Sequence, residues 1–161
     1  MSVELHRLLI ERGKTLALAE SCTGGAIASR LTAMADASKY LLGSLVVYSD
    51  EWKRQFLDVK EKTLQQHGAV SREVVVEMVQ GLFAKTKADY AIAVSGIAGP
   101  TGGSEQHPVG TVYIAVGERG GAIDAGVVRI SPVRSIVIEQ SVQAALDILY
   151  RRLAHNTMSF S

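Results

Sequence analysis

The sequence contains a single cysteine, Cys22, and no long apolar run. One thiol cannot form a disulfide within the chain, and a lone cysteine fits a reducing compartment. No apolar stretch reaches the roughly 18 residues that cross a membrane, and the N-terminal segment mixes charges into its apolar stripe, unlike a signal peptide. We therefore expect a cytoplasmic protein without a membrane partner.

The sequence also lacks an excess of either charge. Its 17 Lys and Arg side chains nearly balance its 16 Asp and Glu side chains, for a formal net charge of +1. Because this balance gives no overall attraction to nucleic acid, we expect no nucleic-acid partner, and any anion binding must be local. A chain of 161 residues that is 47% hydrophobic can bury a sizeable core. Residues 1–161 are expected to form a single domain.

The sequence is organised around residues 15–25, TLALAESCTGG, where an apolar run ends in small hydroxyl, thiol and glycine residues. This pattern predicts a buried strand over residues 15–20 and a helix that begins at Gly24. Ser21, Cys22 and Thr23 would then lie at the carboxyl end of the strand, beside free backbone N–H groups. Open α/β sheets bind their ligands at such positions.

Two later apolar segments end in a similar way. Residues 42–49 predict a second strand that leads into Tyr48-Ser49-Asp50-Glu51-Trp52-Lys53, and residues 89–95 predict a third. Enough sequence for a crossover helix lies before each of them, so the three strands should be parallel. Their carboxyl ends should converge on one pocket.

The remaining segments complete an α/β pattern. Strands are expected at residues 111–116, antiparallel to the third because the glycine-rich connection leaves no room for a helix, and at residues 123–130. Helices are expected at residues 3–12, 25–34, 51–57, 60–67 and 72–87. Asp50 and Ser71 are expected N-caps, and Ser131-Pro132 is expected to cap and open a last helix that ends near residue 154.

Ser21 is the first candidate for chemistry. A serine at a strand-to-helix turn can present its hydroxyl at the edge of a sheet while neighbouring N–H groups stabilise an oxyanion. An ordinary N-cap is the alternative, and spacing alone favours it. Cys22 is a rival nucleophile, because a thiol at a helix N-terminus has a lowered pKa, but it can also be a small packing residue.

Lys53 is the candidate base, because none of the four histidines occupies an obvious partner position. A lysine can act as a base when burial or another charge lowers its pKa. The alternative is a solvated helix lysine. Tyr48 could relay a proton or orient the base, or be only a strand aromatic, and Glu20 and Asp50 could contact a substrate. The histidines are His6, His67, His107 and His155.

The connection after the third strand is rich in glycine. Its glycines permit positive φ and close backbone approach to a phosphate or a planar ring, although a flexible hairpin connection is an alternative. The segment matches neither a Walker loop nor G-x-G-x-x-G. The residues concerned are Ser95, Gly96, Gly99, Gly102 and Gly103.

Four segments carry a resemblance to a known family: AESCTGG, VVYSDEWK, QQHGAVS and SGIAGPTGGSEQHPVGTV. They resemble the CinA-like family, the C-terminal domain of competence/damage-inducible proteins, over about residues 3–154. The resemblance implies a three-layer α/β/α fold with a mixed five-stranded sheet, one strand antiparallel. It also implies a homo-oligomer.

The resemblance further implies an activity. Active members of the family are nicotinamide-nucleotide amidohydrolases, which convert nicotinamide mononucleotide to nicotinate mononucleotide and ammonia without a metal or cofactor. It implies that Ser21 is the nucleophile, Lys53 the base and Tyr48 a nearby assistant. The substrate-binding residues expected are Glu20, Cys22, Thr23, Gly24, Gly25, Asp50, Ser95, Gly96, Gly99, Gly102, Gly103, His107 and Arg134.

The sequence departs from the family pattern at several positions. Asp50 stands where the family usually has Asn, and His107 where it usually has Lys. In the segment that opens the last helix, Arg134 is retained but Ile138 replaces a second arginine, next to a changed stretch that includes Val133. If Asp50 and Ile138 lie in the phosphate subsite, these changes weaken anion binding. A protein that binds a pyridine nucleotide or another ligand without turnover is therefore the alternative to an amidohydrolase.

Overall fold

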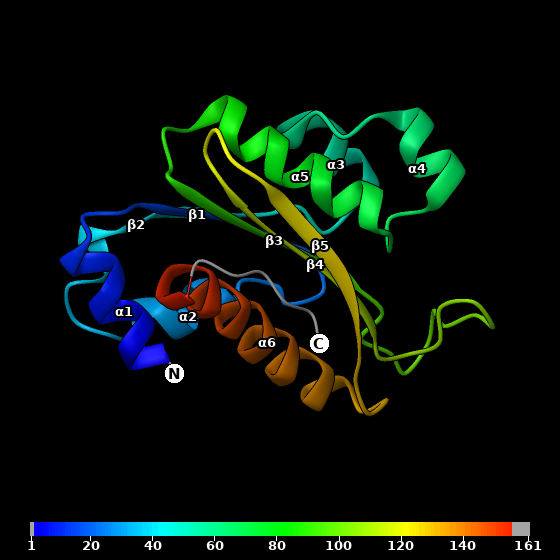
Figure 1. Cartoon of the computed structure of the whole chain (residues 1–161). Coiled ribbons are helices and arrows are strands. Elements are labelled where there is room, and N and C mark those ends of the chain that lie inside the picture. Colours follow the sequence, from blue (N-terminus) through cyan, green and yellow to red (C-terminus); the bar gives the residue numbers. More distant parts are fainter. Residues whose placement is uncertain (1, 156–161) are drawn as a thin grey trace.

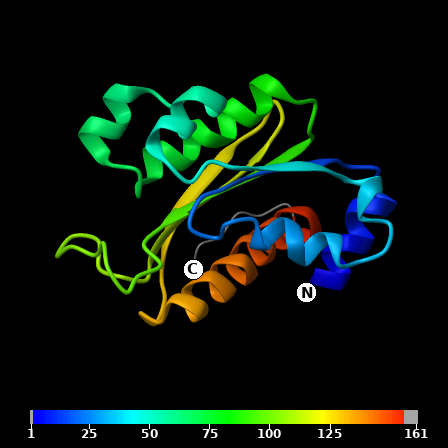
Figure 2. The same cartoon turned by 180° about the vertical axis from the view of Figure 1, so that it is seen from behind.

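The computed structural model describes residues 2–155, which form a five-stranded sheet between two layers of helices (Figure 1). The strands are β1 (Leu16–Glu20), β2 (Leu41–Val46), β3 (Tyr90–Gly96), β4 (Thr111–Glu118) and β5 (Ile123–Arg129). The helices are α1 (Ser2–Glu11), α2 (Ala26–Thr32), α3 (Asp50–Leu57), α4 (Glu61–His67), α5 (Arg72–Lys85) and α6 (Arg134–His155), with a 3-10 turn, η1, at Ala37–Lys39. Helices α1, α2 and α6 cover one face and α3, α4 and α5 lie on the other, as the reverse view confirms (Figure 2).

The sheet has the order β2-β1-β3-β4-β5. Strand β1 is parallel to both β2 and β3, whereas β4 is antiparallel to β3 and to β5. One strand therefore opposes the other four, which confirms the expected mixed three-layer α/β/α fold. The carboxyl ends of β1, β2 and β3 meet at one edge of the sheet, as the sequence predicted.

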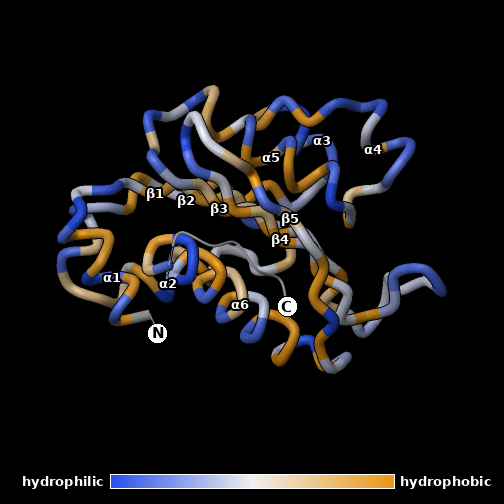
Figure 3. The backbone as a smooth tube through the Cα atoms, viewed as in Figure 1, coloured by the Kyte–Doolittle hydropathy of each residue, from blue (hydrophilic) through white to orange (hydrophobic). Residues whose placement is uncertain are grey.

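The two faces of the sheet differ in the size of their side chains. Along β1, Leu16 and Leu18 belong to the core under α1, α2 and α6, and Ala17 and Ala19 belong to the core under α3 and α5. Strand β3 repeats this alternation. Side chains on successive strand residues point to opposite faces, and the central strands are accordingly mostly apolar (Figure 3).

Three helix starts differ from the sequence prediction. Helix α2 begins at Ala26, because Gly24 and Gly25 adopt positive φ angles of 58° and 99°, which no helix accommodates. Ser49 rather than Asp50 caps α3, since the Ser49 hydroxyl accepts a hydrogen bond from Trp52 N. Helix α6 begins at Arg134, two residues after Pro132. Ser71 caps α5 as predicted.

Helix α3 is held close to the sheet by its packing on α5. A Cβ atom built on Gly81 of α5 would lie 2.1 Å from the Leu57 carbonyl oxygen of α3, so only glycine fits there. This close approach turns one face of α3, with Lys53 and Leu57, inward. Within the described residues, no helix is long and apolar enough to cross a membrane.

Candidate active site

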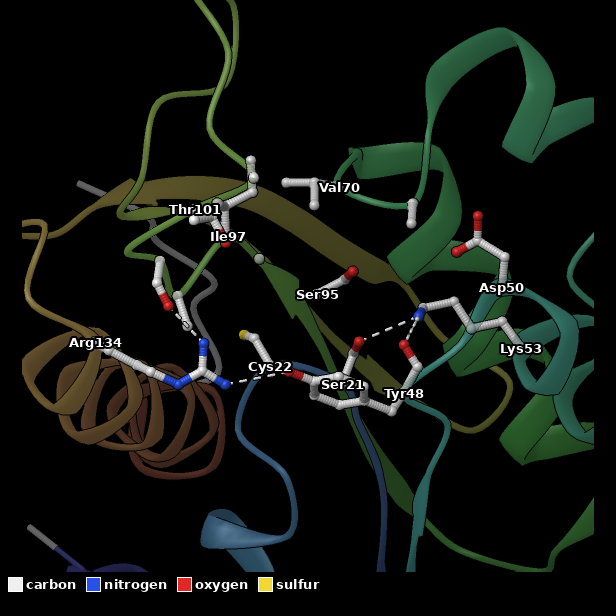
Figure 4. A pocket seen from close by; sticks show the side chains of 15 residues that line it. Ser21, Cys22, Tyr48, Asp50, Lys53, Val70, Ser95, Ile97, Thr101 and Arg134 are labelled. Atoms are coloured by element: carbon white, nitrogen blue, oxygen red, sulfur yellow. Dashed lines mark hydrogen bonds between the residues drawn. The ribbon is translucent and has the colours of Figure 1, made fainter.

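A cavity of about 320 Å³ opens at the carboxyl ends of β1, β2 and β3 (Figure 4). Its volume lies within the range of about 300 to 1,000 Å³ common for small-molecule sites. The loop after β3 and the first residue of α6 form one wall, and α3 forms another. The lining residues are Ser21, Cys22, Tyr48, Asp50, Lys53, Ala69, Val70, Ser95, Gly96, Ile97, Ala98, Gly99, Thr101, Gly102 and Arg134.

Ser21 and Lys53 meet at the floor of this cavity. The Lys53 Nζ atom lies 3.1 Å from Ser21 Oγ, and the two side chains are 1% and 7% exposed. The alternation of side chains along β1 explains this contact between Ser21 and Lys53. Ala19 faces α5, Glu20 faces α2, and Ser21 therefore returns to the face on which α3 presents Lys53. The structure thus brings together the two residues that the sequence singled out.

The surroundings of Lys53 suit a neutral amine. Burial lowers the pKa of Lys53, while the nearby Asp50 carboxylate opposes this by raising it. Besides Ser21 Oγ, Nζ has two carbonyl oxygens in reach, Val47 O at 3.0 Å and Tyr48 O at 3.4 Å. A neutral amine has two N–H groups and one lone pair. Two carbonyls can therefore take the N–H groups and leave the lone pair facing the serine hydroxyl.

Tyr48 contacts the base through its main chain rather than its side chain. Its carbonyl oxygen is an acceptor for Lys53, whereas its phenol oxygen accepts a hydrogen bond from Arg134 Nη2 at 3.2 Å. Arg134 Nη1 donates to the Gly99 carbonyl oxygen. The guanidinium of α6 thus joins Tyr48 after β2 to the loop after β3 across the mouth of the cavity (Figure 4).

The structure places Glu20, an expected substrate contact, outside the cavity. Its side chain is 0% exposed, lies outside the cavity lining and accepts hydrogen bonds from Ile27 N and Ala28 N of α2. The N-terminus of α2 is therefore already occupied by a carboxylate and is not open to a ligand. Thr23 binds the same carboxylate, and Gly24 and Gly25 form the turn rather than the cavity wall.

Cys22 lines the cavity, but its thiol is poorly suited to attack. Burial raises the pKa of Cys22 to about 11, and the Glu20 carboxylate contributes in the same direction. The helix N-terminus that would stabilise a thiolate is the one that Glu20 occupies. A thiol in such surroundings is almost entirely protonated near neutral pH.

This protonation state predicts slow alkylation of Cys22. At pH 8 the folded protein should react with iodoacetamide roughly 100-fold more slowly than the same chain unfolded in urea, because the thiolate is the reacting species. Intact-mass spectrometry over time measures both rates. Equal rates in folded and unfolded protein would mean that the thiol is activated, and would restore Cys22 as a rival nucleophile.

The glycine-rich loop contributes only part of what the sequence predicted. Ser95, Gly96, Gly99 and Gly102 line the cavity, whereas Gly103 and His107 do not. His107 instead packs edge-on against Tyr113, with ring centroids 5.9 Å apart. The loop extends from the body of the molecule (Figure 1).

Ile138, considered above for a phosphate subsite, lies away from the cavity. Ile138 is partly buried against the core under α1, α2 and α6 and does not line the cavity, and Val133 lies outside the lining as well. Arg134 and Asp50 do line it. Five residues of the cavity wall were not predicted from the sequence: Ala69 and Val70, which precede α5, and Ile97, Ala98 and Thr101 of the loop. These small or apolar residues carry no chemical signal in the sequence.

A buried lysine amine aimed at a serine hydroxyl, at the end of a strand, defines the class of Ser/Lys acyl-transfer sites. Comparison with known proteins agrees with the fold. The chain belongs to the CinA C-terminal domain family, whose family model matches residues 1–153.

Among residues 2–155, no group of three or more His, Cys, Asp or Glu is arranged to hold a metal ion.

Several relatives are similar over nearly the whole chain. Nicotinamide-nucleotide amidohydrolase PncC of Escherichia coli K12 is 44% identical over 160 residues, which covers 98% of this chain and 95% of the relative. A CinA-like protein of Shewanella piezotolerans is 49% identical over 153 residues, but the chain spans only 36% of its length. The crystal structure of competence damage-inducible protein A from Klebsiella pneumoniae has a TM-score of 0.92 at 42% identity, covering 97% of this chain and 96% of that one.

Proposed function

We propose that this protein is a nicotinamide-nucleotide amidohydrolase, which hydrolyses the carboxamide of nicotinamide mononucleotide. The observation that carries the proposal is the buried Lys53 amine 3.1 Å from the Ser21 hydroxyl. The similarity to an amidohydrolase that the chain covers almost completely supports the choice of substrate. A cytoplasmic location and a homo-oligomeric state remain expectations from the sequence.

The reaction follows from the two side chains. Neutral Lys53 takes the proton of Ser21 as Oγ attacks the carboxamide carbon, so that a C–O bond forms and the carbonyl oxygen becomes an oxyanion. The lysine returns the proton to the nitrogen, the C–N bond breaks, and ammonia leaves. A water molecule then attacks the resulting ester with Lys53 again as base, which releases the carboxylate and restores Ser21.

Backbone donors beside Ser21 are suited to hold the oxyanion. Within residues 2–155, the N–H groups of Cys22 and Thr23 donate to no oxygen acceptor, although both residues are buried next to the nucleophile. Fixed N–H groups aimed at a developing negative charge stabilise a transition state strongly. They support the proposal that the turn itself, rather than the helix behind it, is the oxyanion site.

The rest of the cavity suits the nucleotide. Ser95 is 1% exposed and its hydroxyl has no hydrogen-bond partner among the described residues, so the hydroxyl is available to the carboxamide. Arg134 and the loop backbone at Gly99 and Gly102 lie at the mouth, where a phosphate would find a cation and N–H donors. In this arrangement the pyridine ring lies inside the cavity and the phosphate lies toward α6.

A binding protein without turnover is the second candidate, and Asp50 is the observation that favours it. Its carboxylate lines the cavity and disfavours an anionic ligand. The two functions are separated by incubating purified protein with nicotinamide mononucleotide and measuring ammonia and nicotinate mononucleotide, beside a thermal-shift titration. Equal amounts of the two products support the amidohydrolase. A rise in Tm without products supports binding alone, and neither effect argues against both.

Asp50→Asn is expected to move the pH profile of the reaction. The Asp50 charge raises the pKa of Lys53, so its removal lets the lysine lose its proton at lower pH. The acidic limb of the kcat/KM profile should therefore shift to lower pH, and KM should fall because one negative charge leaves the cavity. The matched control is Asp58→Asn, which removes the same charge at the other end of α3, where Asp58 pairs with Lys85. An acidic limb that stays in place in Asp50→Asn would contradict the assignment of that limb to Lys53.

A further inference from the structure

Glu20 is the buried charged group that the proposed reaction does not use. We propose that it is a positioning residue, whose carboxylate holds the turn that aims Ser21 at Lys53. The inference rests on the proposed role of Ser21 as nucleophile, and it goes beyond that role because Glu20 itself touches neither the cavity nor Lys53 in the structure.

The carboxylate joins three segments of the chain. Its Oε1 atom accepts hydrogen bonds from Thr23 Oγ1 at 2.7 Å and from Ile27 N at 2.9 Å. Its Oε2 atom accepts from Ala28 N at 3.2 Å and from Ser44 Oγ at 2.8 Å. These donors belong to the turn after β1, to the start of α2 and to β2. One fully buried side chain therefore fixes all three relative to the end of β1.

These hydrogen bonds hold the chain on both sides of the nucleophile. Glu20 immediately precedes Ser21, and Thr23, which donates to the Glu20 carboxylate, lies two residues after Ser21. Ser21 N donates to Val94 O of β3 at 3.1 Å, and Gly24 N donates to Ser21 O at 3.0 Å. The Ser21 main chain is thus held on both sides, and only its side chain is free to face α3. Gly24 and Gly25 have the backbone freedom to let this turn relax once the carboxylate is gone.

The carboxylate suits its donors electrostatically. Backbone N–H groups at a helix N-terminus carry a partial positive charge and stabilise an anion. No cation pairs with Glu20 among residues 2–155, so the start of α2 and two hydroxyls supply its solvation. A neutral amide cannot replace it fully, because an NH₂ group would face the Ala28 N–H.

The test uses Glu20→Gln with a matched control. Asp89 performs a similar structural task at the opposite end of β1, where its Oδ2 atom accepts from Thr15 N and Thr15 Oγ1. Asp89→Asn removes a partly buried carboxylate contact at the start of the same strand, far from the cavity. Displacing a reacting group by about 1 Å costs on the order of 100-fold in rate. We expect Glu20→Gln to lose roughly 100-fold in kcat on nicotinamide mononucleotide with KM nearly unchanged, Ser44→Ala to lose less, and Asp89→Asn to keep the parent kcat.

Two outcomes would overturn the proposal. The first is a kcat for Glu20→Gln that equals that of the parent in the folded fraction, as judged by circular dichroism. The second is an equal loss of kcat in Asp89→Asn. That result would mean that Glu20→Gln lowers kcat only by destabilising the fold. A third readout needs no nucleotide: the rate at which phenylmethanesulfonyl fluoride labels Ser21, measured by mass spectrometry.

The labelling rate separates the two proposals. If the parent is labelled but releases no ammonia, the substrate assignment fails, and a slower labelling of Glu20→Gln than of Asp89→Asn still supports positioning. If Glu20→Gln is labelled as fast as the parent, positioning by Glu20 is wrong. If the parent is not labelled and does not turn over, Ser21 is not an activated nucleophile and both proposals fail.

Discussion

Ser21→Ala is expected to reduce ammonia release from nicotinamide mononucleotide by about 10⁴-fold or more, with the fold intact. The side-chain hydroxyl forms the new C–O bond, and loss of a nucleophile that acts as a unit with its base removes nearly all of their joint contribution. The Ser21 hydroxyl has one hydrogen-bond partner among residues 2–155, the Lys53 amine, so its removal disturbs little else. The measurement is kcat from ammonia release under saturating substrate.

Binding is the control for Ser21→Ala. The variant should still gain Tm with nicotinamide mononucleotide, because Arg134 and the loop at the mouth of the cavity are unchanged. Loss of turnover together with retained binding separates a missing nucleophile from a collapsed site. Turnover within a few-fold of the parent would show that another group attacks the carboxamide.

Lys53→Met should also remove most of the activity and at the same time change how stability depends on pH. Loss of a general base that also returns the proton to the leaving nitrogen typically costs about 10²- to 10⁴-fold in kcat. Met has a similar length and no charge, so it fits the buried space on α3. The matched control is Lys60→Met, which removes the exposed lysine just before α4. Its kcat should equal that of the parent.

The stability effect has a definite sign. Burial lowers the pKa of Lys53 in the folded chain, so between that value and the ordinary lysine value near 10.4 the unfolded chain binds the extra proton. The parent therefore becomes more stable as pH rises through this window, and Lys53→Met lacks the effect. The difference in Tm between Lys53→Met and the parent should move in favour of the parent from pH 7 to pH 10. A difference that stays constant over this range would contradict a depressed pKa.

The part of the site that was predictable from sequence rests on strand ends. Hydrophobic runs that stop at Ser21, Tyr48 and Ser95 indicated three parallel strands, and parallel strands necessarily bring their carboxyl ends together. The Ser21 and Lys53 roles came from the family resemblance, and their contact follows from the topology. The antiparallel β4 was predictable because the preceding loop has too little helix-forming sequence for a crossover.

The places where the cavity lining differs from the expected set have physical reasons that periodicity does not reveal. Glu20 and Ser21 are neighbours in sequence, but the alternation of a strand sends them to opposite faces, so only one of them can enter the cavity. Ile138 was considered for the phosphate subsite because of its position in the family pattern, whereas α6 directs it onto the core under α1, α2 and α6. Helix α3 can pack close to α5 because Gly81 has no Cβ atom. This requirement is visible only when the positions of both helices are known.

The proposed reaction requires that Ser21 becomes acylated by the nicotinate nucleotide. The most direct measurement is rapid acid quench of the protein during turnover of nicotinamide mononucleotide, followed by trypsin digestion and mass spectrometry of the peptide of residues 15–30, which contains Ser21, Cys22 and Thr23. We expect an ester of the nicotinate nucleotide on Ser21, detected by fragmentation and absent in Ser21→Ala. The same adduct located on Cys22 or on another peptide, or a time course that resolves the first turnover and contains no adduct, would contradict it.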